Sequence, residues 1–266
     1  MPLKGKTVFI TGGTGGIGLP LVAMLKKAGA LVDVYDRSID GDLFENLDHV
    51  CARLHNKTPD ILINMAGFNA FDYCENHDYE SLINLNMLTP MRLTQAVLPG
   101  MKKRGCGQIV SIGSMTALIP LPHVTGYVAA KAGLKGFNDA LRRELGGTGI
   151  GGTGIIVTHV VPRAVRTGMN SGARAEINKR TNIHHDDPGK VASIIFKAII
   201  QKKAERRIGW PERFFAFLNA NLPFIIDKGL QKNRKIGEQI LKEYSKHTNH
   251  DKEIKNENVI HIKTTA

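Results

Sequence analysis

The stretch from Thr7 to Ala28 constrains the fold most, because a strand pattern runs there into a glycine-dense turn and then a helical pattern. Thr7–Thr11 is β-branched and apolar, as in a buried strand, and Leu19–Ala28 repeats apolar residues at helical spacing. The turn between them, Gly12–Gly18, contains five glycines. Glycine permits a tight turn and lets backbone N–H groups approach a pyrophosphate at the positive end of a helix. The order of strand, glycine turn and helix therefore predicts a dinucleotide-binding loop.

Strand and helix patterns alternate along the chain up to about residue 210. Apolar strand patterns lie at 31–35, 59–67, 108–112, 155–161 and 207–210, and helical patterns at 79–101, 127–145 and 187–201. This alternation predicts an α/β fold, a doubly wound Rossmann-type parallel sheet with helices on both faces and ligands at the carboxyl ends of the strands. We expect a single domain over residues 1–210, an amphipathic C-terminal helical arm over 211–245 and a polar, frayed tail over 246–266.

Two segments depart from a regular repeat of strands and helices. From Asp40 to His55 there is room for one helix, and the next strand pattern follows at once. We therefore expect one helix, with or without its strand, to be shortened or lost. Pro90 interrupts the helical pattern at 79–101 and should kink or split that helix, because proline has no N–H to donate.

The second strand pattern, Leu31–Tyr35, ends at Asp36 and Arg37, where the identity of a dinucleotide would be read. An acidic side chain at this strand end can accept hydrogen bonds from the ribose hydroxyls of the adenosine, and its charge would repel a 2′-phosphate. Asp36 therefore favours NAD over NADP. Arg37 leaves NADP open, since a guanidinium could hold the phosphate instead.

A tyrosine and a lysine stand four residues apart in the helical pattern at 127–145, so Tyr127 and Lys131 share one helix face. A phenol is ordinarily a poor base at neutral pH, and a neighbouring ammonium favours its phenolate form. Ser114 lies 13 residues before Tyr127, at a strand end. These three side chains beside a nicotinamide suit proton transfer at a carbinol oxygen coupled to hydride transfer at its carbon.

Together these motifs resemble the classical short-chain dehydrogenase/reductase family over about residues 4–210. The resemblance is carried by Thr11–Gly18, Asn64–Gly67, Asn86, Ser114, Tyr127–Lys131 and Pro162–Thr167. It implies that Tyr127 is the catalytic acid/base and that Ser114 orients the substrate carbonyl. It implies further that Lys131 tunes Tyr127 and binds the nicotinamide ribose, and that Asn86 holds a water in a proton relay.

The same resemblance implies a set of cofactor contacts from the strand ends. They are Gly12, Thr14, Gly16, Ile17, Gly18, Asp36, Arg37, Asn64, Ala66, Gly67, Tyr127, Lys131, Pro162, Val165 and Thr167. One departure concerns Arg163, which stands where the family usually has a glycine after the proline. A bulky cation there could alter the loop or meet an acidic group of the substrate.

Basic residues are concentrated in the C-terminal part of the chain. The net charge is +12, and residues 161–266 carry 21 Lys and Arg against 11 Asp and Glu. A solvated surface is the ordinary explanation of such a balance, and we expect no nucleic-acid partner. The aromatic stretch 210–226 precedes several lysines, which leaves open a peripheral membrane contact, an arm that closes over the substrate pocket, or the contact of a homodimer.

The remaining features point to an ordinary protein of a reducing compartment. Three scattered cysteines (Cys51, Cys74 and Cys106) predict free thiols, and we expect a cytoplasmic protein without a signal peptide. The pair His184–His185 in a polar loop is typical of surface residues, so we expect no metal. The glycine repeat 146–155 follows a helix and is expected to be a connection. His123 could reach the substrate or cap its loop.

The sequence thus predicts an NAD(P)-dependent oxidoreductase that interconverts a secondary alcohol and a ketone. An apolar substrate is favoured by Met115, Leu118, Ile119 and Leu121, which follow Ser114. Two alternatives remain at this point: a non-catalytic sensor or scaffold that binds the cofactor only as a ligand, and a peripheral membrane reductase that modifies lipids.

Overall fold

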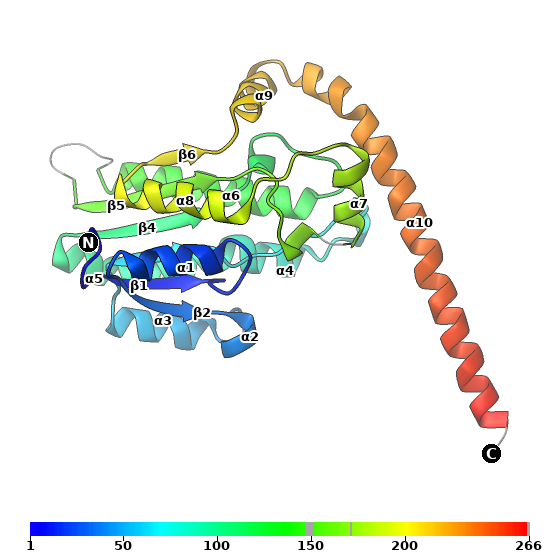
Figure 1. Ribbon diagram of the computed structural model, residues 1–266, viewed down its shortest axis with the longest axis horizontal. Helices are drawn as coiled ribbons and strands as arrows, with labels where there is room; N and C mark the ends of the chain where they lie inside the picture. The colour runs from blue at the N-terminus through cyan, green and yellow to red at the C-terminus, as the bar shows by residue number, and fades with distance from the viewer. Residues whose placement is uncertain (147–151, 171, 265–266) are drawn as a thin grey trace.

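The computed structural model describes residues 1–146, 152–170 and 172–264. Among these residues, six parallel strands form one twisted sheet in the order β2-β1-β3-β4-β5-β6 (Figure 1). The strands are β1 (Thr7–Thr11), β2 (Leu31–Tyr35), β3 (Ile61–Asn64), β4 (Gly107–Ile112), β5 (Ile155–Val161) and β6 (Glu205–Arg207). The last strand lies earlier than the pattern at 207–210 suggested, because Trp210 already belongs to a helix.

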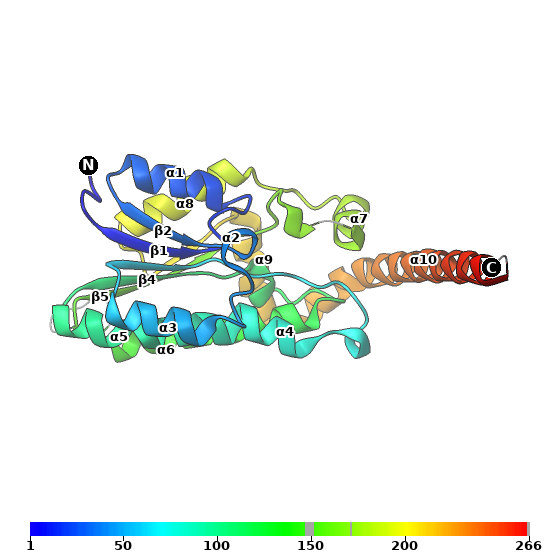
Figure 2. The same ribbon diagram turned by 90° about the horizontal axis from the view of Figure 1, so that it is seen from below.

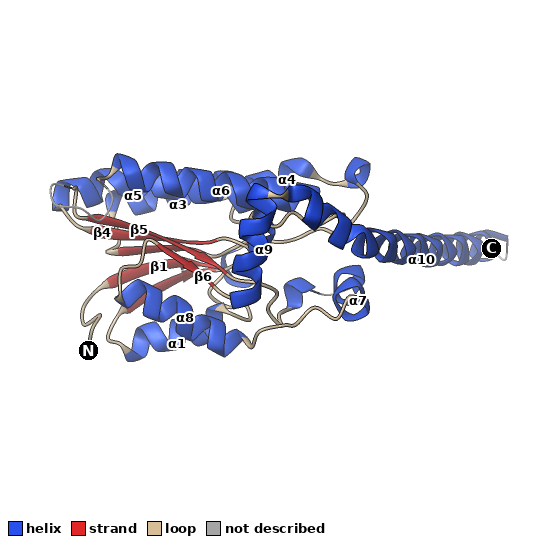
Figure 3. Ribbon diagram, turned by 90° about the horizontal axis from the view of Figure 1, so that it is seen from above, coloured by secondary structure: helices blue, strands red, loops and turns tan. Residues whose placement is uncertain are grey.

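Helices cover both faces of the sheet, as the alternation predicts (Figures 2 and 3). One face carries α1 (Gly18–Lys27) and α8 (Pro188–Ile200), and the other carries α3 (Leu47–Asn56), α5 (Thr89–Arg104) and α6 (Thr125–Glu144). Alternate strand residues supply the two cores: Val8 and Ile10 pack on the side of α1 and α8, whereas Phe9 packs on the other side. The doubly wound Rossmann-type prediction is confirmed.

The short segment after Arg37 leaves β2 at the edge of the sheet. A single-turn helix, α2 (Arg37–Asp40), is followed by α3, which leads directly into β3. Strand β3 pairs with β1 on the side opposite β2, so the chain lays down no further strand beyond β2 among the described residues. All strands remain parallel, but after β2 the chain crosses back over β1 and adds its later strands on the other side. The crevice at the carboxyl ends of β1 and β3, where the strand order reverses, is where such folds bind ligands.

The helical pattern at 79–101 is split, as Pro90 suggests. It consists of α4 (Tyr79–Ile83), a π-helical turn η2 (Asn84–Leu88) and α5. Pro90 has no N–H for the carbonyl four residues earlier, that of Asn86, and the wider turn lies directly before it. Asn86 is fully buried within this turn, and turns of this kind occur frequently at functional sites.

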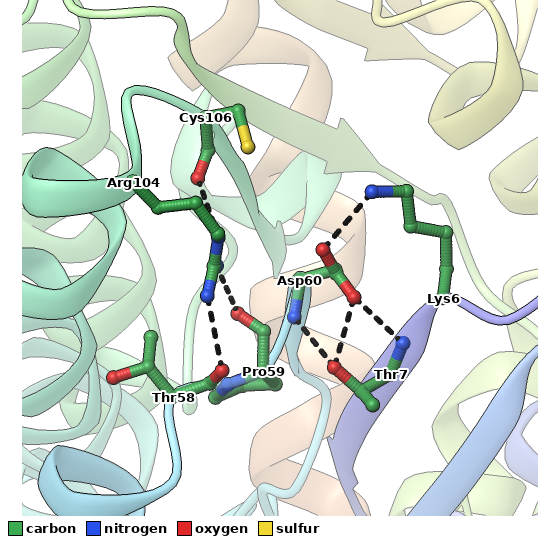
Figure 4. A network of polar contacts seen from close by, with 7 residues as sticks. All are labelled: Lys6, Thr7, Thr58, Pro59, Asp60, Arg104 and Cys106. Atoms are coloured by element: carbon green, nitrogen blue, oxygen red, sulfur yellow. Dashed lines mark hydrogen bonds and ion pairs between the residues drawn. The ribbon is translucent and has the colours of Figure 1, made fainter.

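A polar network fixes the opposite, amino ends of the central strands (Figure 4). The Asp60 carboxylate accepts hydrogen bonds from the Thr7 backbone and side chain, both at 2.9 Å, and from Lys6 at 3.1 Å. Burial acts to raise the pKa of Asp60, but these hydrogen bonds outweigh it and hold the pKa below its ordinary value. The Arg104 guanidinium donates to the carbonyls of Thr58, Pro59 and Cys106. The network joins β1 to β3 far from the crevice.

Two helices follow the sheet and form the predicted arm. Helix α9 (Trp210–Asn221) lies across the carboxyl ends of the strands, and α10 (Pro223–Thr264) extends away from the body of the molecule (Figures 1 and 3). Helix α10 continues through residue 245, where the sequence suggested that the arm passes into a frayed tail. No helix among the described residues is long and apolar enough to span a membrane. Most of the glycine repeat, residues 147–151, lies outside the described residues.

Candidate active site

The glycine turn between β1 and α1 has the close backbone approaches that require glycine. Gly12 has φ +73°, and its N–H donates to the Tyr35 carbonyl at 2.9 Å. A Cβ on Gly18 would overlap the Gly12 carbonyl oxygen and lie 2.6 Å from the Gly13 carbonyl carbon. A Cβ on Gly16 would lie 2.7 Å from the Thr167 side chain, so the turn packs against the loop after β5.

Asp36 lies beside this turn at the end of β2. Its carboxylate accepts hydrogen bonds from the Thr14 N–H at 3.1 Å and from Ser38. Burial acts to raise the pKa of Asp36, but the hydrogen bonds from Thr14 and Ser38 prevail and lower it. Arg37 is 85 % exposed and lies 3.8 Å from Asp42. The acidic group is therefore fixed and ionised, whereas the neighbouring guanidinium is free to move in solvent.

The end of β3 forms the other wall of the crevice. The Thr11 hydroxyl accepts hydrogen bonds from the N–H groups of Met65 and Ala66, both at 3.1 Å. A Cβ on Gly12 would come within 3.0 Å of Ala66. Both amide atoms of Asn64 are buried and lack a hydrogen-bond partner within the described ranges. Two unsatisfied polar atoms under a glycine turn fit a site that receives a polar ligand.

Tyr127, Lys131 and Ser114 line one cavity of about 410 Å³ at the carboxyl ends of β4 and β5. Tyr127 is 7 % exposed. The Lys131 ammonium donates to the Ile112 carbonyl at 3.1 Å and lies 5.7 Å from the centre of the Tyr127 ring. The Ser114 hydroxyl lies 2.8 Å from that of Thr116. The structure thus brings together the three side chains that the helix spacing and strand end suggested.

Burial dominates the ionisation of this pair. It raises the pKa of Tyr127, and the Ser114 hydroxyl and the positive charge of Arg174 offset this only in part. Burial also lowers the pKa of Lys131 to about 8. Tyr127 is therefore a protonated hydroxyl at neutral pH, and an ammonium alone does not make it a phenolate in this protein.

Asn86 lies behind the cavity, next to Lys131. Its amide nitrogen donates to the carbonyls of Phe68 at 2.9 Å and Leu82 at 3.0 Å. Its amide oxygen is buried and has no hydrogen-bond partner in the described parts of the chain. A Cβ on Gly67 would lie 2.5 Å from this oxygen and 3.5 Å from the Lys131 nitrogen. Because residue 67 is glycine, the place of its missing Cβ is not filled, and the Asn86 oxygen and the Lys131 nitrogen both lie within 3.5 Å of that place.

The predicted cofactor residues divide into two groups along the strand ends. The first group lines the cavity and consists of Ile17, Gly67, Tyr127, Lys131, Pro162, Val165 and Thr167. The remaining predicted contacts lie outside its lining, around the ends of β1, β2 and β3, and are Gly12, Thr14, Gly16, Gly18, Asp36, Arg37, Asn64 and Ala66. This extended arrangement fits a dinucleotide with its adenosine at β2 and its nicotinamide in the cavity.

Arg163 does not point freely toward a substrate. Its guanidinium makes two hydrogen bonds of 2.8 Å to the Asp186 carboxylate and one of 3.0 Å to Glu212. Glu212 lies in the first turn of α9. Arg163 lines the cavity, but these acidic side chains already balance its charge, and the side chain ties the loop after β5 to the arm.

The two histidines considered from the sequence lie in different places relative to the cavity. His123 does not line the cavity; its ring stacks edge-on against Phe71 and Tyr73, and its Nε2 lies 3.2 Å from the Arg234 carbonyl of α10. His184 does line the cavity. No group of three or more potential metal ligands occurs in the part of the chain that the structure describes.

Sequence reasoning missed Arg174, which lines the cavity from α7 (Gly172–Arg180). This helix has no amphipathic pattern and carries no motif, so nothing in its local sequence indicates that one arginine points inward. Glu212 was missed for a related reason, since its place in the cavity wall depends on where α9 crosses the sheet.

Comparisons with known proteins agree with this geometry. The sequence profile of the short chain dehydrogenase family matches residues 40–178. Ketoacyl reductase HetN of Nostoc sp. is 32% identical over an alignment of 232 residues, and the match covers 76% of this chain and 78% of that protein. The 3-oxoacyl-[acyl-carrier-protein] reductase FabG of Pseudomonas aeruginosa is 31% identical over an alignment of 198 residues, and the match covers 64% of this chain and 77% of that protein.

Among solved structures, a short chain dehydrogenase from Burkholderia cenocepacia in complex with NADP has the same fold, with a TM-score of 0.69, 21% identity, and coverage of 87% of this chain and 99% of that chain. The chain therefore belongs to the short-chain dehydrogenase family. It is an oxidoreductase of the class that acts on CH–OH and C=O groups with NAD or NADP.

Proposed function

We propose that this enzyme interconverts a secondary alcohol and a ketone, with Tyr127 as the proton donor and acceptor. The observation that carries the proposal is the convergence of Tyr127, Ser114 and Lys131 on one cavity next to the loop after β5. The nicotinamide cofactor, when bound, supplies or accepts the hydride.

Burial keeps the Tyr127 hydroxyl protonated at neutral pH, so that it can act as a proton donor. Because its pKa is raised, the hydroxyl is protonated and can give its proton to the carbonyl oxygen as a ketone is reduced. The Ser114 hydroxyl would donate a second hydrogen bond to the same oxygen. The Lys131 ammonium would stabilise the phenolate that forms, and Asn86 with Lys131 would hold the water that returns a proton to Tyr127.

The cavity walls favour a substrate with a largely apolar body. Met115, Ile119 and Leu121 line the cavity, as does Ile183. Leu118, which the sequence suggested beside them, instead accepts a hydrogen bond through its carbonyl from Asn219 of α9 at 3.0 Å. Helix α9 is thereby held over the cavity, which supports its role as a cover that limits access of water to the reacting groups.

NAD is the cofactor that the strand end favours, although the similar Burkholderia structure contains NADP. We expect NADH to bind at least about tenfold more tightly than NADPH, because the ionised Asp36 carboxylate would repel a 2′-phosphate. Fluorescence titration with NADH and with NADPH measures the ratio of their dissociation constants. Asp36→Ala should bring the two dissociation constants closer together. Asp33→Ala is the matched control, because Asp33 lies on β2 itself and its carboxylate pairs with Arg53 at 3.5 Å, away from the glycine turn. Tighter binding of NADPH by the unaltered enzyme would overturn the assignment.

Another possibility that the sequence left open, a non-catalytic sensor or scaffold, is disfavoured by the membership of the chain in an oxidoreductase family. The intact set of Ser114, Tyr127 and Lys131 favours the enzyme. Reduction of NAD during incubation with a panel of secondary alcohols separates the two candidates, since a sensor would bind the nucleotide and give no NADH.

We further propose that the outer face of α9 contacts a membrane surface from the cytoplasmic side. Trp210, Phe214 and Phe217 recur at helical spacing and are 79%, 56% and 63% exposed. The opposite face carries Glu212, which lines the cavity, the buried Ala216, and Asn219, which donates to the Leu118 carbonyl. Exposed cations lie close to these rings in the sequence. Arg213 is on α9 itself, and Lys228, Lys232, Arg234 and Lys235 are in the first turns of α10. Aromatic rings beside cations suit an anionic lipid interface, and three free thiols are consistent with a reducing compartment.

Flotation with liposomes tests this contact. The enzyme should float with vesicles that contain phosphatidylserine and float less with phosphatidylcholine alone, because the cations add electrostatic attraction. Substituting Trp210, Phe214 and Phe217 together by serine should abolish flotation and leave turnover of a water-soluble ketone unchanged. If the substituted protein instead changes from dimer to monomer in light scattering, the face binds a second copy of the chain and the membrane proposal fails.

A further inference from the structure

Arg174 places a positive charge in the catalytic cavity. It lies on α7 and lines the same cavity as Tyr127 and Ser114. Its guanidinium carbon is 6.0 Å from the centre of the Phe71 ring, and its charge acts to lower the pKa of the Tyr127 hydroxyl. The aromatic face of Phe71 can hold a guanidinium flat while leaving its N–H groups available. Arg174 thus shares one cavity with the proposed proton donor Tyr127.

The guanidinium has no acidic partner in the described parts of the chain. Its Nε is buried and makes no hydrogen bond there, and no ion pair there includes Arg174. Two neighbouring arginines are paired: Arg163 with Asp186 and Glu212, and Arg180, on the same helix, with Glu176 and Glu243. An arginine remains charged in a protein, and a desolvated charge without a partner is costly unless a ligand supplies one.

The cofactor phosphates are poorly placed to be that partner. The glycine turn that would hold them packs against Thr167 through Gly16. Arg174 instead lies over the Phe71 ring, in the loop after β3, and lines the cavity together with Tyr127. Glu212 also lines the cavity, but its carboxylate pairs with Arg163, which leaves the substrate as the source of negative charge for Arg174.

We propose that Arg174 binds an anionic group of the substrate, a carboxylate or a phosphate, and so selects acidic alcohols and ketones over neutral ones. This inference rests on the proposed oxidoreductase function and narrows its substrate class. The planar fork of the guanidinium matches both anions through paired hydrogen bonds, and the apolar walls accept the rest of the molecule. The sequence pointed to Arg163 for this role, and the pairing of that residue leaves the role to Arg174.

The test compares substrates that differ only in charge. Medium-chain oxo-carboxylic acids are assayed beside their methyl esters, and phosphate monoesters of hydroxyketones beside the unphosphorylated compounds. For the favoured anion, Arg174→Met should lower kcat/KM by about 10- to 100-fold, as expected for loss of a charged hydrogen bond. The neutral partner should change by less than about threefold. Arg174→Lys should retain part of the preference, and Arg180→Met should retain all of it.

Binding measurements separate this inference from the proposed reaction. Calorimetry with the same acids and the NAD complex should show weaker binding to Arg174→Met, with unchanged affinity for NAD itself. Such binding without any turnover would remove the proposed reaction and leave the anion site. Equal losses for acids and esters, or a matching loss of NAD affinity, would overturn the assignment of Arg174 to the substrate. Melting temperatures of all variants identify a variant that fails to fold.

Discussion

Replacing Tyr127 with phenylalanine should lower turnover by about a thousandfold while cofactor affinity stays within about twofold. The substitution removes only the hydroxyl that would exchange a proton with the substrate oxygen, and the ring remains packed in its buried place. Steady-state rates with a ketone and NADH measure the first quantity, and fluorescence titration of NADH measures the second. Because burial raises the pKa of Tyr127, ketone reduction by the unaltered enzyme should be retained at neutral pH, and alcohol oxidation should increase as the pH rises.

Tyr79→Phe is the matched control for this loss. The Tyr79 hydroxyl also makes hydrogen bonds, to the Thr125 hydroxyl and the Cys74 carbonyl, both at 2.9 Å, but it does not line the cavity. Its removal should leave turnover nearly unchanged. Retention of more than a tenth of the activity by Tyr127→Phe, or an equal loss in both variants, would show that Tyr127 is not the proton donor.

The second large effect is expected from Gly18→Ala, which should weaken cofactor binding at least about tenfold. A Cβ at this position overlaps the Gly12 carbonyl and lies 2.6 Å from the Gly13 carbonyl carbon. Both are backbone atoms, so the added methyl group can be accommodated only if the turn opens. An open turn no longer presents its N–H groups together to a pyrophosphate. Calorimetric titration with NAD measures the loss.

Gly15→Ala tests whether the effect belongs to that close approach or to any substitution in the turn. The nearest atom to a Cβ at Gly15 is the Gly12 carbonyl oxygen at 3.4 Å, which is an ordinary contact. Cofactor affinity should therefore change by less than about threefold in this variant. Equal weakening by both substitutions would contradict the steric explanation, and unchanged affinity in Gly18→Ala would contradict the assignment of the turn to the cofactor.

Features that depend on neighbouring residues were predicted well from the sequence. β1 and β2 have the expected bounds, and α8 (Pro188–Ile200) matches the helical pattern at 187–201 to within one residue at each end, with the Asp187 carboxylate accepting from the Lys190 N–H at 3.0 Å. The spacing of Tyr127 and Lys131 places both in one cavity because helix periodicity alone decides which residues share a face. The three cysteines are free thiols, as their scatter suggested.

Features that depend on distant partners were not predictable in this way. The sequence singles out Arg163, after the strand pattern at 155–161, but not Arg174, and says nothing of the surroundings of either. Arg163 is neutralised because Asp186 and Glu212, 23 and 49 residues further along the chain, reach it in the folded protein. Arg174 has no such neighbour in the described residues. The periodicity of a helix or strand is set by local backbone geometry, whereas the charge balance of a cavity depends on which remote segments pack around it. Hence the reaction class follows from local motifs, and the charge of the substrate follows only from the assembled pocket.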